Sequence, residues 1–163
     1  MVLGCAARGM VWLSRKKVAM AETRPESTEL PVVHVAAGII RSGSKIFATA
    51  RGYGDWQGWW EFPGGKIEPG ETAQEALVRE LHEELAVAVT VGEYAGLIEY
   101  DYPTFHLHMD CYWAELKPGE HPKLLEHEAA RWLEIGELDS VKWLPADVEF
   151  IRELQSRGFG DAR

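Results

Sequence analysis

The sequence predicts an α/β protein of the α+β kind, in which helices cover both faces of a mixed β-sheet. Three observations predict it. The length of 163 residues is that of one domain with a substantial hydrophobic core. The β-rich segments occur in pairs separated by short turns, which is typical of hairpins. Two amphipathic segments have helical periodicity, and this order fits a mixed sheet better than a parallel doubly wound one.

A hairpin is predicted at the start of the domain. Residues 32–40 and 46–50 are rich in apolar and β-branched residues, and the turn-forming residues 41–45 separate them. A loop rich in glycine and tryptophan follows at residues 51–60.

A helix is predicted next, over residues 72–86. Thr72 and Glu75 have the spacing of a capping box, which satisfies free backbone donors at a helix start. Apolar residues recur at helical intervals and should form one buried stripe. The stripe consists of Ala73, Ala76, Leu77, Leu81 and Leu85.

The second half of the chain returns to β-structure and ends in a helix. Alternating or continuous apolar character predicts three strands, and two further segments have helical character. The predicted strands are 87–100, 105–116 and 129–134, and the helical segments are 135–141 and 146–156.

The composition is that of an ordinary soluble protein, with 46% hydrophobic and 26% charged residues. A net charge of −9 argues against a nucleic-acid polymer or an anionic membrane as the main partner. It leaves room for a small polyphosphate, because a bound metal and a few cations can reverse the field inside a cleft. Cys5 and Cys111 are far apart, so we expect no disulfide framework and a reducing, cytoplasmic compartment.

The two ends of the chain differ from the predicted domain, which spans residues 31–157. Residues 1–30 have a basic cluster at 15–17, on the wrong side of the apolar stretch for a signal peptide. We expect this segment to be an N-terminal extension that is either disordered or an artefact of the assigned start, with Met20 as the alternative start. Residues 158–163 form a C-terminal tail.

Three carboxylates share one face of the predicted helix. Glu80, Glu83 and Glu84 are spaced i, i+3 and i+4, so their like charges repel one another. A hard divalent cation such as Mg²⁺ or Mn²⁺ removes that repulsion because it prefers carboxylate oxygens. The alternative is an acidic helix face that is simply solvated.

The residues around this face follow a longer pattern, G-x5-E-x7-R-E-U-x-E-E-x-G-U, where U is a bulky aliphatic residue. The pattern is similar to the Nudix box and departs from it at Ala86, where the family has glycine. Because glycine tolerates the left-handed conformation at a helix end, we expect Ala86 to strain or lengthen the helix. The matching residues are Gly65, Glu71, Arg79, Glu80, Leu81, Glu83, Glu84 and Val87.

This resemblance extends over about residues 31–154 and is nearest to the MutT-like branch. It implies an α/β/α sandwich with a loop–helix–loop catalytic motif. It also implies Mg²⁺-dependent hydrolysis of (deoxy)nucleoside triphosphates to monophosphate and diphosphate, with Mn²⁺ able to substitute. The implied metal ligands are the carbonyl of Gly64 and the carboxylates of Glu80, Glu83, Glu84 and Glu126.

Roles for individual box residues follow from the same resemblance. Glu80 is the implied general base, although family members differ in which glutamate serves. Arg79 is expected to pair with Glu71 and hold the motif together, rather than being exposed. Gly65 has a structural role.

Substrate contacts are predicted outside the box. The resemblance places Arg51 at the phosphates, with an ordinary loop arginine as the alternative. Asp147 is expected at the base edge, where an acid recognises cytosine-type or oxidised purine bases such as that of 8-oxo-dGTP, unless it caps the last helix. Phe62 and Tyr102 can flank the base or belong to the core.

Two other functions stay open from the sequence. One is hydrolysis of another nucleoside diphosphate derivative, and the other is a non-catalytic module that senses a nucleotide. The expected partner is a small nucleotide, and the protein is expected to be a monomer or homodimer. His106 and His108 alternate on one strand face, but the carboxylates already explain metal binding.

Overall fold

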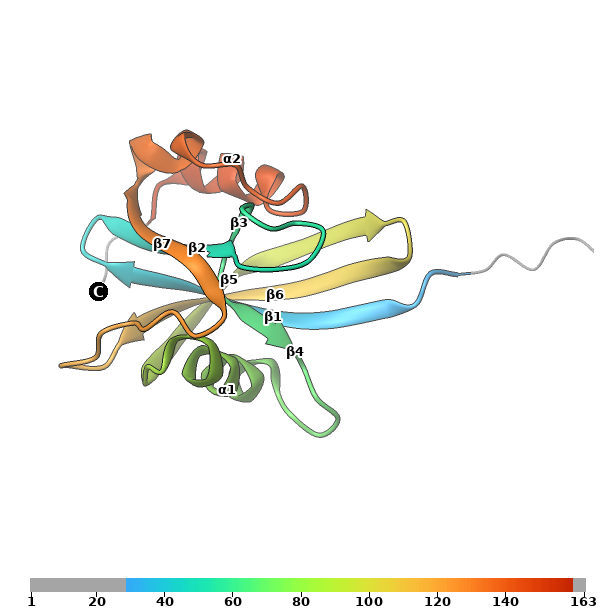
Figure 1. Cartoon of the computed structure of the whole chain (residues 1–163), viewed down its shortest axis with the longest axis horizontal. Helices are drawn as coiled ribbons and strands as arrows, with labels where there is room; N and C mark the ends of the chain where they lie inside the picture. Colours follow the sequence, from blue (N-terminus) through green and yellow to red (C-terminus); the bar gives the residue numbers. More distant parts are fainter. Residues whose placement is uncertain (1–28, 160–163) are drawn as a thin grey trace, which may run out of the picture.

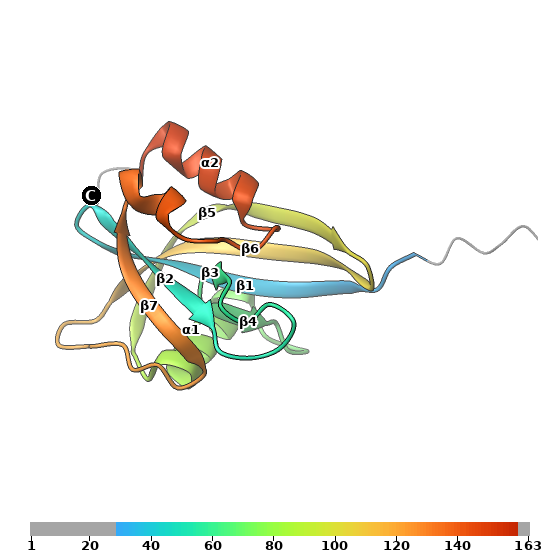
Figure 2. The same cartoon turned by 45° about the horizontal axis from the view of Figure 1, so that its top comes forward.

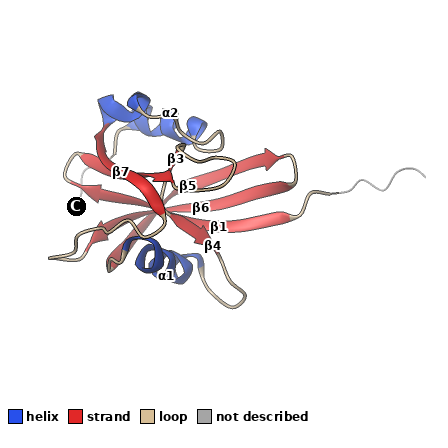
Figure 3. Cartoon of the chain, viewed as in Figure 1, coloured by secondary structure: helices blue, strands red, loops and turns tan. Residues whose placement is uncertain are grey.

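A mixed β-sheet with a helix on each face forms the body of the molecule. The computed structural model describes residues 29–159. Helix α1 (Ala73–Leu85) covers one face of the sheet and helix α2 (Val148–Arg157) the other (Figure 1). The α/β/α sandwich is therefore confirmed, and Figure 3 shows the three layers by secondary structure. Neither helix combines the length and apolar character that crossing a membrane requires.

The sheet contains seven strands, and its main path runs β3-β2-β1-β6-β5. Strands β1 and β6 are parallel, whereas β1–β2, β5–β6 and β2–β7 are antiparallel. The short strand β4 pairs with residues 35–37 of β1, whereas β2 pairs with residues 41–42 of β1, so the sheet divides into two branches along this edge of β1. The strands are β1 (Val32–Ser42), β2 (Lys45–Arg51), β3 (Trp60–Glu61), β4 (Gly64–Lys66), β5 (Val89–Tyr102), β6 (Phe105–Leu116) and β7 (His127–Glu134).

Helix α1 begins with the predicted capping box. The Thr72 side chain accepts a hydrogen bond from the Glu75 N–H, and the Glu75 side chain accepts one from the Thr72 N–H. The helix buries Leu77, Leu81 and Leu85 completely against the sheet. Burying each leucine contributes about 1.5–3 kcal/mol, so this stripe holds the acidic face of α1 in a fixed position.

The end of helix α1 departs from the usual conformation of its residue type. Ala86 adopts the left-handed region, with φ 53° and ψ 39°, and its N–H donates to the His82 carbonyl. It is the one non-glycine residue with positive φ in the range 29–159. The predicted outcome of alanine here is therefore strain, and the helix is not lengthened beyond Leu85.

A second core lies beneath helix α2. Phe150, Ile151 and Leu154 pack against apolar residues of β1, β2, β6 and β7. The turned view in Figure 2 shows α2 lying along this face, preceded by the 3₁₀ helix η1 (Ile135–Ser140). Strand β1 contributes to both cores, which explains its continuous apolar run from Ala36 to Ile40.

The predicted elements are present with shifted ends. The hairpin turn is shorter than predicted, and β2 continues to Arg51. The strand predicted at 129–134 begins at His127, because β7 pairs with β2 up to Arg51. Strands β3 and β4 were not predicted, since their pairing with β2 and β1 has no signal in these short segments. The expectation for residues 1–28 lies outside the described residues, as do residues 160–163.

Candidate active site

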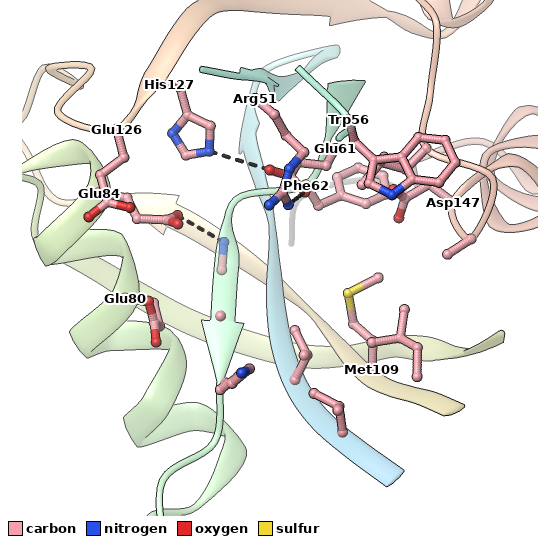
Figure 4. A pocket seen from close by; sticks show the side chains of 18 of the residues that line it. Arg51, Trp56, Glu61, Phe62, Glu80, Glu84, Met109, Glu126, His127 and Asp147 are labelled. Atoms are coloured by element: carbon pink, nitrogen blue, oxygen red, sulfur yellow. Dashed lines mark hydrogen bonds and ion pairs between the residues drawn. The ribbon is translucent and has the colours of Figure 1, made fainter. Parts of the chain in front are cut away.

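A cleft of about 740 Å³ opens between the two helical layers. Its walls come from β1, β2, β4, β6, α1 and the loops before β7 and α2. The cleft has an acidic end at helix α1 and an aromatic end near Asp147 (Figure 4). Most of the predicted site residues line it, namely Arg51, Phe62, Gly64, Gly65, Arg79, Glu80, Glu83, Glu84, Tyr102, Glu126 and Asp147.

Glu84 is a partly buried carboxylate of the acidic end. Its Oε2 accepts a hydrogen bond of 3.2 Å from the Gly64 N–H, which links α1 to β4. The pKa of Glu84 is raised to about 7, mainly by burial, with an opposing effect of His127 and a smaller raising effect of the Glu61 carboxylate. A buried carboxylate beside like charges favours either a proton or a cation.

Gly65 and Gly64 allow the backbone to approach helix α1 and strand β1. A Cβ at Gly65 would overlap the Glu80 carboxylate, and one at Gly64 would overlap the Ala36 carbonyl. Gly64 also has φ +151°, a conformation that other residues rarely adopt. The two glycines therefore bring β4 alongside the acidic face of the helix.

Arg79 links the loop before helix α1 to the acidic face. Its Nε lies 2.7 Å from Glu71 Oε1 and its Nη2 2.9 Å from Glu71 Oε2, which is a bidentate pair. Nη2 also donates to the Lys66 carbonyl at 3.0 Å, and Nη1 donates to Glu80 Oε1 at 2.8 Å. The hydrogen bonds from Arg79 lower the pKa of Glu71 to about 2. The predicted Arg79–Glu71 pair is present, and Glu71 itself lies outside the cleft lining.

The carboxylates of the acidic end suit a hard divalent cation by their chemistry. Glu80, Glu84 and Glu126 face the same part of the cleft (Figure 4). Glu83 lines the cleft as well and is more exposed than Glu80, with 55% of its side chain accessible. Among residues 29–159 no three His, Cys, Asp or Glu side chains converge on one point. Arg79 holds Oε1 of Glu80 and the Gly64 N–H holds Oε2 of Glu84, which leaves the second oxygen of each carboxylate for an ion.

Two site residues have no counterpart in the sequence predictions. Glu61 accepts a 2.8 Å hydrogen bond from Arg51 Nη1, and its Oε1 lies 3.6 Å from His127 Nε2. The His127 side chain is only 5% exposed, and its Nδ1 has no hydrogen-bond partner within residues 29–159. Glu61 belongs to the segment EFPGGK that leads into the box, and His127 follows Glu126 directly. Their positions next to predicted site segments are the sequence features that could have indicated both residues.

Asp147 lies buried at the aromatic end of the cleft, with 1% of its surface exposed. It occupies the N-cap position, directly before Val148 of α2, but its side chain makes no cap hydrogen bond, so the capping alternative is not what the structure shows. Its Oδ1 has no partner among the described residues. Burial, with a smaller effect from Glu61, raises the pKa of Asp147 well above its usual value.

Aromatic rings flank Asp147. Phe62 packs in the core against Trp143, with ring centroids 5.2 Å apart, and also lines the cleft. Tyr102 stacks on Phe105 at 4.8 Å and meets the edge of Trp56 at 6.1 Å. Both rings therefore pack with core residues and also line the cleft, and their contact with a base stays a prediction.

The sandwich and the acidic cleft define a hydrolase of the Nudix type. A comparison with protein families matches residues 32–154 to the family described as NUDIX domain. The chain belongs to the Nudix family.

Curated relatives support this assignment. The chain is 35% identical over 130 residues to the CTP pyrophosphohydrolase of Escherichia coli K12, covering 78% of this chain and 94% of the relative. It is 36% identical over 125 residues to the 8-oxo-dGTP diphosphatase of Haemophilus influenzae, covering 76% and 91%.

Solved structures agree with the fold. The E. coli ORF135 protein superimposes with a TM-score of 0.68 at 32% identity, covering 81% of this chain and 96% of that one. A MutT protein from Methanosarcina mazei has a TM-score of 0.70 at 23% identity, covering 83% and 100%, and supports the fold alone.

Proposed function

We propose that the protein hydrolyses (deoxy)nucleoside triphosphates to monophosphate and diphosphate, and that cytosine or oxidised purine nucleotides are its preferred substrates. The observation that supports this most is the division of one cleft into two ends. Carboxylates and Arg51 lie at one end, and a buried acid with aromatic neighbours lies at the other. A triphosphate with its base spans two such environments. The names of the two relatives favour the same substrate class.

At the acidic end, Glu80, Glu83, Glu84, Glu126 and the Gly64 carbonyl would hold Mg²⁺, or Mn²⁺ in its place. The ion neutralises phosphate charge and acidifies a bound water when present. Glu80 accepts the proton of the attacking water. Glu126 also accepts a 3.2 Å hydrogen bond from the Tyr53 hydroxyl, which holds it over the cleft.

Arg51 binds the phosphates in this proposal. Its Nη1 is held by Glu61, so one edge of the guanidinium is fixed while the rest faces the cleft. A guanidinium that is already oriented loses little freedom when it binds an anion.

Asp147 reads the base edge. A neutral carboxylic acid presents one donor and one acceptor side by side. That pair matches N3 and N4 of cytosine, and also O6 and the protonated N7 of an 8-oxo purine. It does not match the O6 and N7 edge of guanine, where both atoms are acceptors. Phe62 and Tyr102 confine the plane of the base.

The test is a panel of nucleotides assayed with Mg²⁺ and scored for diphosphate against phosphate. We expect diphosphate release, fastest with CTP, dCTP or 8-oxo-dGTP. Faster turnover of a nucleotide sugar would favour the other hydrolase, and binding without turnover would make the protein a sensor. We further propose residues 31–157 as the catalytic domain and a monomer or homodimer as the working state.

A further inference from the structure

A second group of metal-ligating side chains lies on the sheet face that carries α1, beyond the end of that helix. The β5–β6 hairpin and the first residues of β1 extend past α1 (Figure 1). Three histidines and three carboxylates project from these strands. They are His34 on β1, His106, His108 and Asp110 on β6, and Glu99 and Asp101 on β5.

The strand register places three of these residues in one row. His34 is the Cα partner of His108 in the parallel pair, and His108 is the Cα partner of Glu99 in the antiparallel pair. Directly paired residues on neighbouring strands project on the same face with Cβ atoms about 4.5–5.5 Å apart. The row therefore presents two imidazoles and a carboxylate to the same volume of solvent.

The separation of the two imidazoles suits a shared ion. The ring centroids of His34 and His108 are 5.0 Å apart. Two imidazoles bound to one tetrahedral ion at about 2.0–2.1 Å place their centroids about 5 Å apart. The rings are tilted by 58° and are not stacked, so nitrogen atoms of both can face one point after rotation about the side-chain bonds.

The remaining side chains complete the donor set. Glu99 Oε1 lies 3.3 Å from His108 Nδ1 and 3.8 Å from His106 Nε2. Asp101 Oδ1 holds His106 Nδ1 at 2.6 Å, which leaves Nε2 of that ring directed at Glu99. A carboxylate behind an imidazole in this way orients the ring and raises its basicity as a ligand.

No three metal-ligating side chains of residues 29–159 converge on one point in the present arrangement. We propose that His34, His106, His108 and Glu99 turn toward one another to form a second metal site, which binds a divalent transition-metal ion. Imidazole donors select ions such as Zn²⁺, Ni²⁺ or Co²⁺ over Mg²⁺, so the site is chemically distinct from the carboxylates of the cleft. The side chains of His106 and His108 are each 30% exposed. They can turn toward an ion without disturbing the core.

The site lies directly behind the floor of the cleft. Val33 and Val35 flank His34 in sequence, Leu107 and Met109 flank His108, and all four line the cleft on the opposite face. An ion that joins β1, β6 and β5 therefore fastens the strands on which the substrate rests.

The test uses the full-length protein without a polyhistidine tag, titrated with Zn²⁺ in an excess of Mg²⁺ that saturates the cleft. We expect one Zn²⁺ per chain and a rise in Tm with Zn²⁺ concentration. His108→Gln should weaken Zn²⁺ binding at least about tenfold, and so should His34→Gln, whose side chain is exposed. His121→Gln, on an exposed loop, is the matched control and should bind like the wild type.

Co²⁺ provides a second readout, because its visible absorption reports tetrahedral coordination. Glu84→Gln should keep the Zn²⁺ and Co²⁺ signals, since it changes only the cleft. Absence of Zn²⁺ binding in excess Mg²⁺ would overturn the proposal. Binding that survives both His108→Gln and His34→Gln but disappears in Glu84→Gln would overturn it as well.

Discussion

Glu84 of α1 and the backbone N–H of Gly64 in β4 form a 3.2 Å hydrogen bond across the acidic end of the cleft. The same carboxylate is buried enough for its pKa to rise to about 7. The folded protein thus holds a carboxylate where an uncompensated negative charge is unfavourable. At this position the negative charge that suits a metal ligand therefore lowers the stability of the metal-free protein.

Glu84→Gln should lower kcat at least about 100-fold, because it removes a charged metal ligand. The same variant should raise the Tm of the metal-free protein at neutral pH. The folded pKa lies above the ordinary value of 4.5, so ionisation opposes folding. The stabilising difference should grow between about pH 4.5 and pH 7 and stay constant above, reaching on the order of 1–2 kcal/mol.

Glu83→Gln is the matched control for the stability measurement. Its side chain is 55% exposed on the same helix, so it should lose activity without gaining stability. Thermal unfolding in EDTA across pH 4 to pH 8 tests both variants. A metal-free Glu84→Gln no more stable than wild type at pH 8 would contradict the burial argument.

Arg79→Lys should lower kcat by about 10- to 100-fold and raise the Mg²⁺ concentration needed for half-maximal rate. A lysine keeps the charge but cannot contact Glu71 at two oxygens while also reaching the Lys66 carbonyl and Glu80. The loop before α1 is then no longer held at a fixed distance from the acidic face. Small displacements of the catalytic groups lower the rate strongly.

Arg152→Lys, an exposed substitution on α2, is the control for Arg79→Lys and should leave both quantities unchanged. Steady-state kinetics over a Mg²⁺ series measures them. An Arg79→Lys enzyme with wild-type kcat and Mg²⁺ dependence would show that the hydrogen bonds of the Arg79 guanidinium to Glu71, Glu80 and the Lys66 carbonyl are not needed for activity.

Asp147→Ala should lower the ratio of kcat/KM for 8-oxo-dGTP to that for dGTP by about 10- to 100-fold, because a buried hydrogen-bonding pair that matches only the oxidised base is lost. Asp147→Asn should change this ratio less, since an amide also presents a donor beside an acceptor. Asp139→Ala, on exposed η1, is the control. Equal ratios in all three variants and the wild type would remove Asp147 from base recognition.

Local patterns allowed much of the fold to be predicted, and contacts between distant segments account for most of what was missed. The capping box of Thr72 and Glu75 lies within four residues, so its sequence pattern suffices. Strand β4 contains two glycines and little β-propensity, and it forms because β1 supplies its partner. Glu61 and His127 meet because β3 and β7 both pair with β2.

The candidate site divides in the same way. The box residues share a short helix and loop, so their spacing implies their proximity. The sequence left two interpretations of Asp147 open, recognition of the base and capping of the last helix. An acid before a helix has the same pattern whether it caps the helix or faces a cleft. The missing cap hydrogen bond and the burial of Asp147 in the cleft wall decide against the cap, and both depend on tertiary packing.

Ala86→Gly should stabilise the protein by about 0.5–1 kcal/mol without changing kcat. Ala86 has φ 53° at the end of α1, where an alanine Cβ is strained by about 1–2 kcal/mol and glycine is not. Part of this gain is offset because glycine makes the unfolded chain more flexible. Chemical denaturation of Ala86→Gly measures the gain, and Ala73→Gly at the start of the same helix should give none. Destabilisation by Ala86→Gly would mean that the strain at this position is smaller than the entropy that glycine adds to the unfolded chain.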